Sequence, residues 1–110
     1  MSENKKLEWI KPYRKKIDDL DDQIIDLLTR RIAVIREVGH IKADKDVPAV
    51  LPDRVEEVRE RNVERAREKG LDAELIRELY TRLIDYSCNL EEEIKRDKTK
   101  KDIFDEDAFG

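Results

Sequence analysis

The sequence has few of the residues that interrupt helices: only three glycines and three prolines occur among its 110 residues. Aromatic residues are also scarce, at 5%, whereas Asp, Glu, Lys and Arg together make up 47%. This balance favours long, solvated helices and argues against a sheet protein. The modest apolar content would leave a monomer with little surface to bury, so we expect the chain to oligomerise.

Other features that are missing exclude several classes of protein. The lone cysteine, Cys88, excludes an internal disulfide, and the N-terminus lacks the apolar core of a signal peptide, so we expect a cytoplasmic protein. No apolar run approaches the roughly 20 residues that a membrane span requires. Positive and negative residues are interleaved and the net charge is only -4, so the sequence offers no basic face for a nucleic acid.

What the sequence does contain is a long helical pattern at its N-terminal end. From about Lys6 to about Ala43, apolar residues recur in steps of three and four: Ile10, Tyr13, Ile17, Leu20, Ile24, Leu27, Val34, Val38 and Ile41. At about 1.5 Å per residue, the predicted helix is roughly 60 Å long. Because the rest of so short a chain cannot cover a rod of this length, the helix needs a partner along it.

Two further helices are predicted after this rod. The second begins at Pro52, which suits a first helical position, and runs to about Lys69, where Gly70 supplies a stop. Asp72 is placed to cap the third helix, which carries apolar residues as far as Ile94. The sequence therefore predicts an all-helical fold with three helices per chain and a long first helix.

The predicted organisation is one helical domain over residues 1–94 and a tail over residues 95–110. The tail is charged and aperiodic, so we expect most of it to be frayed or disordered. Residues 44–51 form the loop between the first two helices, with prolines as helix breakers.

One position on the apolar stripe of the first helix is charged. Arg31 lies between Leu27 and Val34 on that stripe, and Lys42 follows 11 residues later at nearly the same helical angle. The simpler interpretation is an arginine that reaches from the edge of an interface into solvent. The functional interpretation is a pair of fixed cations that face a polar cavity and bind an anion, and the second cation favours it.

The third helix has an acidic residue on its apolar stripe. Tyr80, Ile84, Ser87 and Glu91 fall on one face, which Ile94 continues. An ionised carboxylate is costly on an apolar face without partners, so Glu91 is a candidate site residue. The simpler alternative is that it opens the solvated acidic run that follows it.

The remaining reactive residues give weaker signals. His40 is more typical of a surface residue than of a ligand, and no spacing of Cys, His and Asp predicts a metal site. Cys88 has no activating partner in the sequence and is interpreted as a packed core thiol. Trp9 and Tyr13 stand at helical spacing and are interpreted as packing residues.

Five short motifs, in this order and spacing, resemble those of the all-helical (AroQ) class of chorismate mutases. They are Arg14-Lys15-Lys16-Ile17-Asp18, Leu27-Leu28-Thr29-Arg30-Arg31, Val38-Gly39-His40-Ile41-Lys42, Pro52-Asp53-Arg54, and Leu83-Ile84-Asp85-Tyr86-Ser87 followed by Glu91. The resemblance implies an intertwined homodimeric helical bundle in which the long first helices cross between subunits. It also implies an isomerase that rearranges chorismate to prephenate, in phenylalanine and tyrosine biosynthesis, without metal or cofactor.

The resemblance also implies a role for each matched residue. Arg14 of one chain and Arg31 of the other would bind the two carboxylates of the substrate, and Arg54 would help to order the site. Lys42 would donate to the ether oxygen, and Glu91 stands where the family usually has a glutamine that makes the second contact. The substrate ring would lie against Ser87 and the apolar walls formed by Val38, Ile84 and Cys88.

Two departures from the family pattern leave the identity of the substrate undecided. Family mutases often have acids that contact the ring hydroxyl at the positions of Leu51 and Val55, which are apolar here. The loop after Lys42 also resembles that of the isochorismate-pyruvate lyases, which share the fold. An isochorismate-pyruvate lyase or an aminodeoxychorismate mutase is therefore the alternative enzyme. The non-enzyme alternative is a helical dimerisation or regulatory module, which would not need Arg14, Arg31, Lys42 and Arg54 together.

Overall fold

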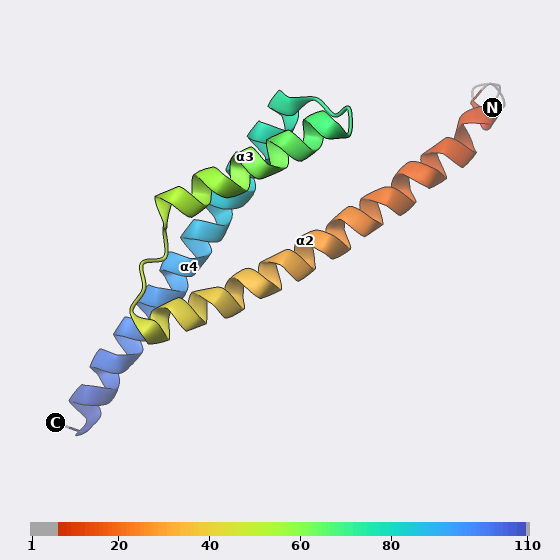
Figure 1. Cartoon of the computed structure of the whole chain (residues 1–110). Coiled ribbons are helices and arrows are strands. Elements are labelled where there is room, and N and C mark those ends of the chain that lie inside the picture. Colours follow the sequence, from red (N-terminus) through yellow and green to blue (C-terminus); the bar gives the residue numbers. More distant parts are fainter. Residues whose placement is uncertain (1–6, 110) are drawn as a thin grey trace. The chain divides into compact units, whose positions relative to one another are not determined.

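The computed structural model describes residues 7–109, with side chains described for residues 7–102. A short 3-10 helix, η1 (Glu8–Ile10), precedes three α-helices: α2 (Lys11–Lys45), α3 (Pro52–Glu68) and α4 (Ala73–Phe109) (Figure 1). No strand occurs within residues 7–109. The predicted all-helical class and the three helices, with a long first one, are confirmed.

Contacts within the chain divide it into two compact units, residues 1–33 and residues 34–110. The described part of the first unit consists of η1 and the N-terminal part of α2. Most of its large apolar side chains are about half exposed or more, and this set comprises Trp9, Tyr13, Ile17, Leu20, Ile24, Ile25 and Leu27. Within residues 7–102, the structure therefore gives no support to the interpretation of Trp9 and Tyr13 as packing residues.

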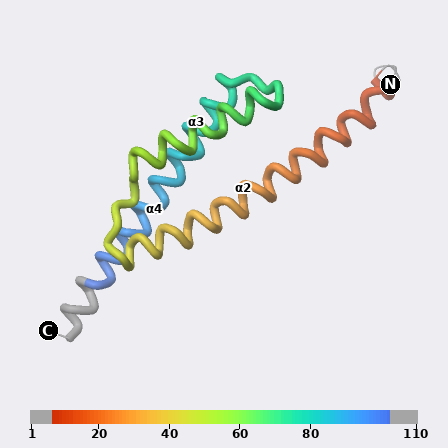
Figure 2. The backbone as a smooth tube through the Cα atoms, in the orientation of Figure 1, coloured from red at the N-terminus to blue at the C-terminus, as the bar shows by residue number. Residues whose placement is uncertain are grey.

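The second unit is built on the pairing of α3 with α4, which run side by side (Figure 2). Val63 and Ala66 of α3 and Ile84 and Leu90 of α4 form most of its small buried core. Polar contacts add to this packing: the guanidinium of Arg59 donates to the hydroxyl of Thr81 at 3.1 Å. In a second contact, Arg77 pairs with Glu60, and this hydrogen bond lowers the pKa of Glu60.

The ends of α3 and the start of α4 follow the predicted signals. Pro52 occupies the first turn of α3, and Gly70 adopts a φ of 75°, a left-handed conformation that ends the helix without steric cost. The side chain of Asp72 then accepts hydrogen bonds from the backbone N–H groups of Glu74, at 2.9 Å, and Leu75, at 3.2 Å. Asp72 is therefore the N-cap that the sequence indicates.

The helix α4 continues well past Ile94, where the apolar pattern ends, and reaches Phe109. Ion pairs rather than an apolar stripe accompany this extension. Lys98 lies 3.6 Å from Asp102 one turn later, a spacing that supports an exposed helix. The helix therefore extends well into residues 95–110, where its periodic pattern gives no indication of it.

None of the helices in the described part of the chain combines the length and the apolar character needed to cross a membrane.

Candidate active site

The second unit brings together two of the predicted site residues from different helices. The ammonium Nζ of Lys42, in the last turns of α2, lies 3.0 Å from the carboxylate Oε1 of Glu91 on α4. The Lys42 side chain is 19% exposed and that of Glu91 only 6%. An ion pair this deeply enclosed is costly to form and marks a candidate functional site.

The carboxylate of Glu91 is only partly satisfied by this pairing. Its Oε1 atom is buried and accepts no hydrogen bond of acceptable geometry within the described residues, although the ammonium of Lys42 is close. We therefore treat the contact as a charge interaction that leaves hydrogen-bonding capacity unused. Buried polar atoms in this condition are rare and call for an explanation, which keeps Glu91 a candidate site residue.

Glu91 differs clearly from the acidic residues that follow it. Glu92 and Glu93 are exposed, whereas Glu91 is buried together with Ile84 and Ser87 on the same stripe of α4. The hydroxyl of Ser87 donates to the carbonyl of Leu83 at 2.8 Å. The alternative that Glu91 merely opens a solvated run is wrong, because its side chain faces the interior of the second unit.

Lys42 is also held by the loop that follows it. Its ammonium donates a hydrogen bond to the carbonyl oxygen of Ala49 at 2.9 Å. Its own backbone carbonyl accepts the N–H of Val47 at 2.8 Å. The acceptor at Ala49 is a backbone atom, which the sequence gives no means of recognising.

A glycine allows the two helices to approach closely at the ion pair. Gly39, one turn before Lys42, is the buried residue of α2. A Cβ built at this position would lie 3.0 Å from the Cδ1 of Ile94 and 3.4 Å from the Cγ of Glu91. Glycine inside a helix destabilises the helix by about 1 kcal/mol relative to alanine. A glycine in the middle of a helical pattern is therefore a sequence signal for a position of close packing.

Cys88 and Val38 lie partly buried in the same unit. Burial, assisted by the negative charge of Glu91, raises the pKa of the Cys88 thiol. The thiol is therefore a poor nucleophile, in keeping with its interpretation as a packing residue. His40 is exposed, as predicted.

Residues around the start of α3 are less enclosed. Arg54 is exposed and donates to the Oε1 of Glu57 at 2.6 Å, so its described ion pair lies within α3. Leu51 precedes the helix and is 39% exposed, and Val55 is partly buried and donates its N–H to the carbonyl of Leu51. The structure thus does not bring the guanidinium of Arg54 to the Lys42–Glu91 pair through any described contact.

The remaining predicted cations, Arg14 and Arg31, belong to the first unit. Arg14 is exposed and Arg31 partly buried. They stand 17 residues apart on α2, which corresponds to about 26 Å along the helix axis and to different helical faces. One copy of α2 therefore does not direct both guanidinium groups to a single small ligand.

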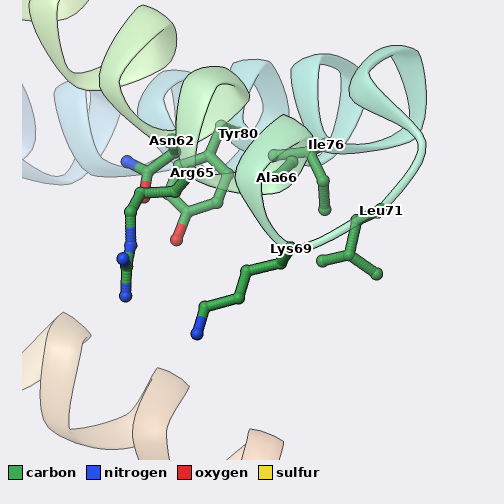
Figure 3. Close-up of a pocket in the computed structure, with 7 residues that line it drawn as sticks. All are labelled: Asn62, Arg65, Ala66, Lys69, Leu71, Ile76 and Tyr80. Carbon is green, nitrogen blue, oxygen red and sulfur yellow. The ribbon is translucent and has the colours of Figure 1, made fainter.

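The second unit also contains a shallow hollow away from this ion pair. Its volume is about 190 Å³, and it lies between α3, the following turn and α4 (Figure 3). The lining residues are Asn62, Arg65, Ala66, Lys69, Leu71, Ile76 and Tyr80. None of the predicted site residues is among them. Lys42 and Glu91 are the better candidate site, because there the charged groups are enclosed, whereas Arg65 is largely exposed and pairs with Glu68.

Comparison with known proteins identifies the family. The sequence pattern of the chorismate mutase type II family matches residues 13–92. The chain therefore belongs to this family. The matched segment contains Lys42, Glu91 and all the other predicted site residues.

Three relatives illustrate the range of the family. A bifunctional chorismate mutase/prephenate dehydratase of Aquifex aeolicus is 29% identical over 81% of this chain, which spans only 25% of that protein's length. A 4-amino-4-deoxychorismate mutase of Streptomyces venezuelae is 30% identical over 84% of this chain and 86% of its own. A chorismate mutase of Methanocaldococcus jannaschii is 24% identical over 86% of this chain and 96% of its own.

Proposed function

We propose that this protein is a chorismate mutase that rearranges chorismate to prephenate and works as an intertwined homodimer. The observation that carries the proposal is the enclosed Lys42–Glu91 pair, which lies inside the segment that matches the family. Relatives with full-length matches include a chorismate mutase, which supports the same reaction.

The reaction explains why charged donors suffice for such a site. Chorismate rearranges in one concerted step, in which a carbon–oxygen bond breaks as a carbon–carbon bond forms. The protein has to hold a flexible dianion in its compact reactive shape, which is an effect of orientation. It also has to stabilise the negative charge that grows on the departing ether oxygen, with donors that are already in place.

Lys42 is suited to the second task. A lysine ammonium has three N–H donors, of which one is directed to the carbonyl of Ala49 and a second faces Glu91. The third donor is left for the ether oxygen or a carboxylate of the substrate. Because the ammonium is held at 2.9 Å by Ala49, little reorganisation is needed when charge develops.

Glu91 is proposed as the second group that contacts the ether oxygen. An ionised carboxylate only accepts hydrogen bonds, so Glu91 donates to that oxygen only when it carries a proton. The unused hydrogen-bonding capacity of its buried Oε1 supports a role toward a ligand.

The carboxylates of the substrate are assigned to Arg14 of one chain and Arg31 of its partner. The separation of these residues along α2 supports this assignment, because one copy of the helix directs them to different faces. The apolar stripe of the first unit, which includes Leu20 and Ile24, is about half exposed and supports burial against a second copy.

The remaining roles are proposed on the same basis. Arg54 would help to order the site after it gives up its ion pair with Glu57 and pairs with a group beside the ligand. The substrate ring would lie against Ser87, Ile84, Val38 and Cys88, of which Ser87 and Ile84 are buried on the stripe of Glu91.

A second candidate function is favoured by the apolar residues at the start of α3. Leu51 and Val55 offer no hydrogen bond to a ring hydroxyl, and two relatives of the chain are 4-amino-4-deoxychorismate mutases. A substrate with a different ring substituent, either 4-amino-4-deoxychorismate or isochorismate, is therefore the alternative ligand of the same site.

An assay of the purified protein with all three substrates distinguishes these functions. Each substrate is incubated with the protein and with a Lys42→Ala control, and the products are identified by chromatography with mass and proton NMR spectra. We expect prephenate from chorismate at the highest kcat/KM. A preference for 4-amino-4-deoxychorismate, or release of pyruvate from isochorismate, selects the alternative. Absence of turnover with all three contradicts an enzymatic function.

A further inference from the structure

The C-terminal part of α4 contacts the loop that follows Lys42. The ammonium of Lys95 lies 3.4 Å from the carboxylate Oδ1 of Asp46 and donates to the carbonyl of Val47 at 3.3 Å. One turn later, the ammonium of Lys98 lies 3.3 Å from the Oδ1 of Asp44. The hydrogen bond with Asp44 raises the pKa of Lys98. The two lysines thus hold Asp44, in the last turn of α2, and Asp46 and Val47, in the loop that follows.

The same loop holds both the backbone carbonyl and the side-chain ammonium of Lys42. The N–H of Val47 bonds the backbone carbonyl of Lys42, and the carbonyl of Ala49 accepts from its ammonium. The conformation of residues 43–49 therefore sets both the end of α2 and the direction of the Lys42 side chain.

This loop conformation includes an unfavourable backbone angle. Asp46 has a φ of 54°, in the left-handed region that residues other than glycine seldom adopt. Such a conformation persists only when its surroundings hold it. Backbone hydrogen bonds from Asp46 to Ala43 and from Val47 to Lys42 hold it, and the contacts of Lys95 with Asp46 and with the carbonyl of Val47 are placed to add to them.

We propose that Lys95 and Lys98 are positioning residues, which clamp residues 44–47 and thereby hold the Lys42 ammonium in its reactive direction. This inference rests on the proposed function of Lys42. It gives a role to the segment of α4 that extends beyond the apolar pattern of the domain. The clamp acts on the substrate only through Lys42.

If Lys95 and Lys98 served only to stabilise α4, a different result would be expected. Lys98 also pairs with Asp102 within α4, at 3.6 Å, and this contact would support the helix alone. The contacts of Lys95 with Asp46 and Val47, in contrast, bridge 49 and 48 residues along the chain, respectively. Exposed ion pairs add little to global stability, so loss of the clamp should appear locally, in the loop.

The first test compares the double variant Lys95→Gln/Lys98→Gln with Lys100→Gln/Lys101→Gln, which removes the same charge from exposed positions of α4. Hydrogen exchange of residues 43–49 is measured without substrate. We expect exchange of the Val47 amide to be about tenfold faster in the clamp variant and unchanged in the control, with the same melting temperature. Equal protection of this amide in both variants overturns the proposal.

The second test measures turnover of whichever substrate the wild-type protein converts. We expect kcat of the clamp variant to fall about tenfold with KM changed by less than about twofold, since Lys42 acts on the transition state. Lys98→Asp should lower kcat, and Asp44→Lys/Lys98→Asp should restore at least half of the loss by reversing the pair. Failure of the reversed pair to recover kcat, or an unchanged kcat despite faster exchange, contradicts a positioning role.

The two tests separate this inference from the function on which it rests. If the wild-type protein converts none of the three substrates, the proposed function fails, and the catalytic part of the inference fails with it. The exchange comparison still decides whether the lysines clamp the loop.

Discussion

The two parts of α2 differ in what surrounds their important side chains. In the first unit, apolar residues such as Leu20 and Ile24 are about half exposed. In the second unit, the glycine and lysine of the same helix contact α4 closely, and a charged pair is enclosed there. Exposed apolar surface and enclosed charge are both unfavourable in a fully assembled protein.

The difference teaches that the proposed function uses the two parts of this helix for two purposes. In the proposed dimer, the N-terminal part is the assembly surface that a second copy covers, and the C-terminal part carries half of the reactive site. A second copy would cover the first and complete the second, because Arg14 and Arg31 would then reach a site from separate chains. The predictions below test each side of this comparison, in order of decreasing effect.

Lys42→Ala should have the largest effect, with kcat/KM lowered by about 10²- to 10³-fold, the usual cost of removing one transition-state donor. The variant also leaves the buried carboxylate of Glu91 without its cation, so some loss of stability is expected. The matched control is Lys45→Ala, an exposed lysine three residues later on the same helix. Kinetics with the preferred substrate and thermal unfolding are measured for both. Near wild-type turnover by Lys42→Ala would show that the chemistry lies elsewhere.

Leu20→Asp should weaken self-association at least about 100-fold, because burial of a charge on an apolar interface is costly and a two-fold dimer contains the change twice. The control, Thr29→Asp, adds the same charge nine residues later, on the opposite helical face. Sedimentation of dilute protein measures the effect. If wild-type protein is a folded, active monomer at sub-micromolar concentration, the first unit is not an assembly surface.

Gly39→Ala should lower kcat/KM about tenfold, because the added methyl group displaces Glu91 and Ile94 from their contacts with α2. Alanine favours the helix by about 1 kcal/mol, which offsets part of the cost of the displaced contacts, so any fall in the melting temperature should be small. Ile94→Val removes the Cδ1 atom that lies closest, and the double variant should recover part of the activity. Full activity of Gly39→Ala alone would show that the close approach is not needed.

Glu91→Gln should retain or raise kcat/KM at neutral pH. An amide donates a hydrogen bond at any ordinary pH, whereas a carboxyl group donates only when protonated. Kinetics with the preferred substrate are measured for both proteins at neutral pH. A variant with a much lower kcat/KM than wild-type protein would remove Glu91 from the role of hydrogen-bond donor.

The same substitution has a second readout at Cys88. Because the charge of Glu91 contributes to the raised pKa of this thiol, Glu91→Gln should lower that pKa and speed alkylation at pH 8 by a few fold. Since Cys88 is the single cysteine of the sequence, the reaction reports on this site alone. An unchanged alkylation rate would show that Glu91 carries no charge near the thiol at this pH.

Much of this fold could be predicted from the sequence, because its signals are local. The apolar periodicity, Pro52, Gly70 and Asp72 gave the helices and most of their ends. The extension of α4 to Phe109 was not evident, because this segment has no apolar spacing. It is accompanied instead by ion pairs and by the contacts that Lys95 and Lys98 make with residues distant in the sequence.

The candidate site could be predicted only in part. Lys42 and Glu91 stood out as charges on apolar stripes, and they meet at 3.0 Å. The contact of Lys42 with the Ala49 carbonyl and the close approach of the helices at Gly39 depend on backbone positions, which side-chain patterns do not encode. Arg14, Arg31 and Arg54 were assigned through family resemblance, and their roles stay predictions.

The most direct test of a site shared between chains is complementation between two inactive variants. Arg14→Ala and Arg31→Ala proteins are purified, mixed under conditions in which subunit exchange is confirmed, and assayed with the substrate that wild-type protein prefers. Each alone should be nearly inactive. A heterodimer should contain one intact site and one doubly damaged site, so exchange should restore up to about one quarter of wild-type activity, since half of the dimers are mixed and each has one of two sites intact. Confirmed exchange without any return of activity would contradict the shared site.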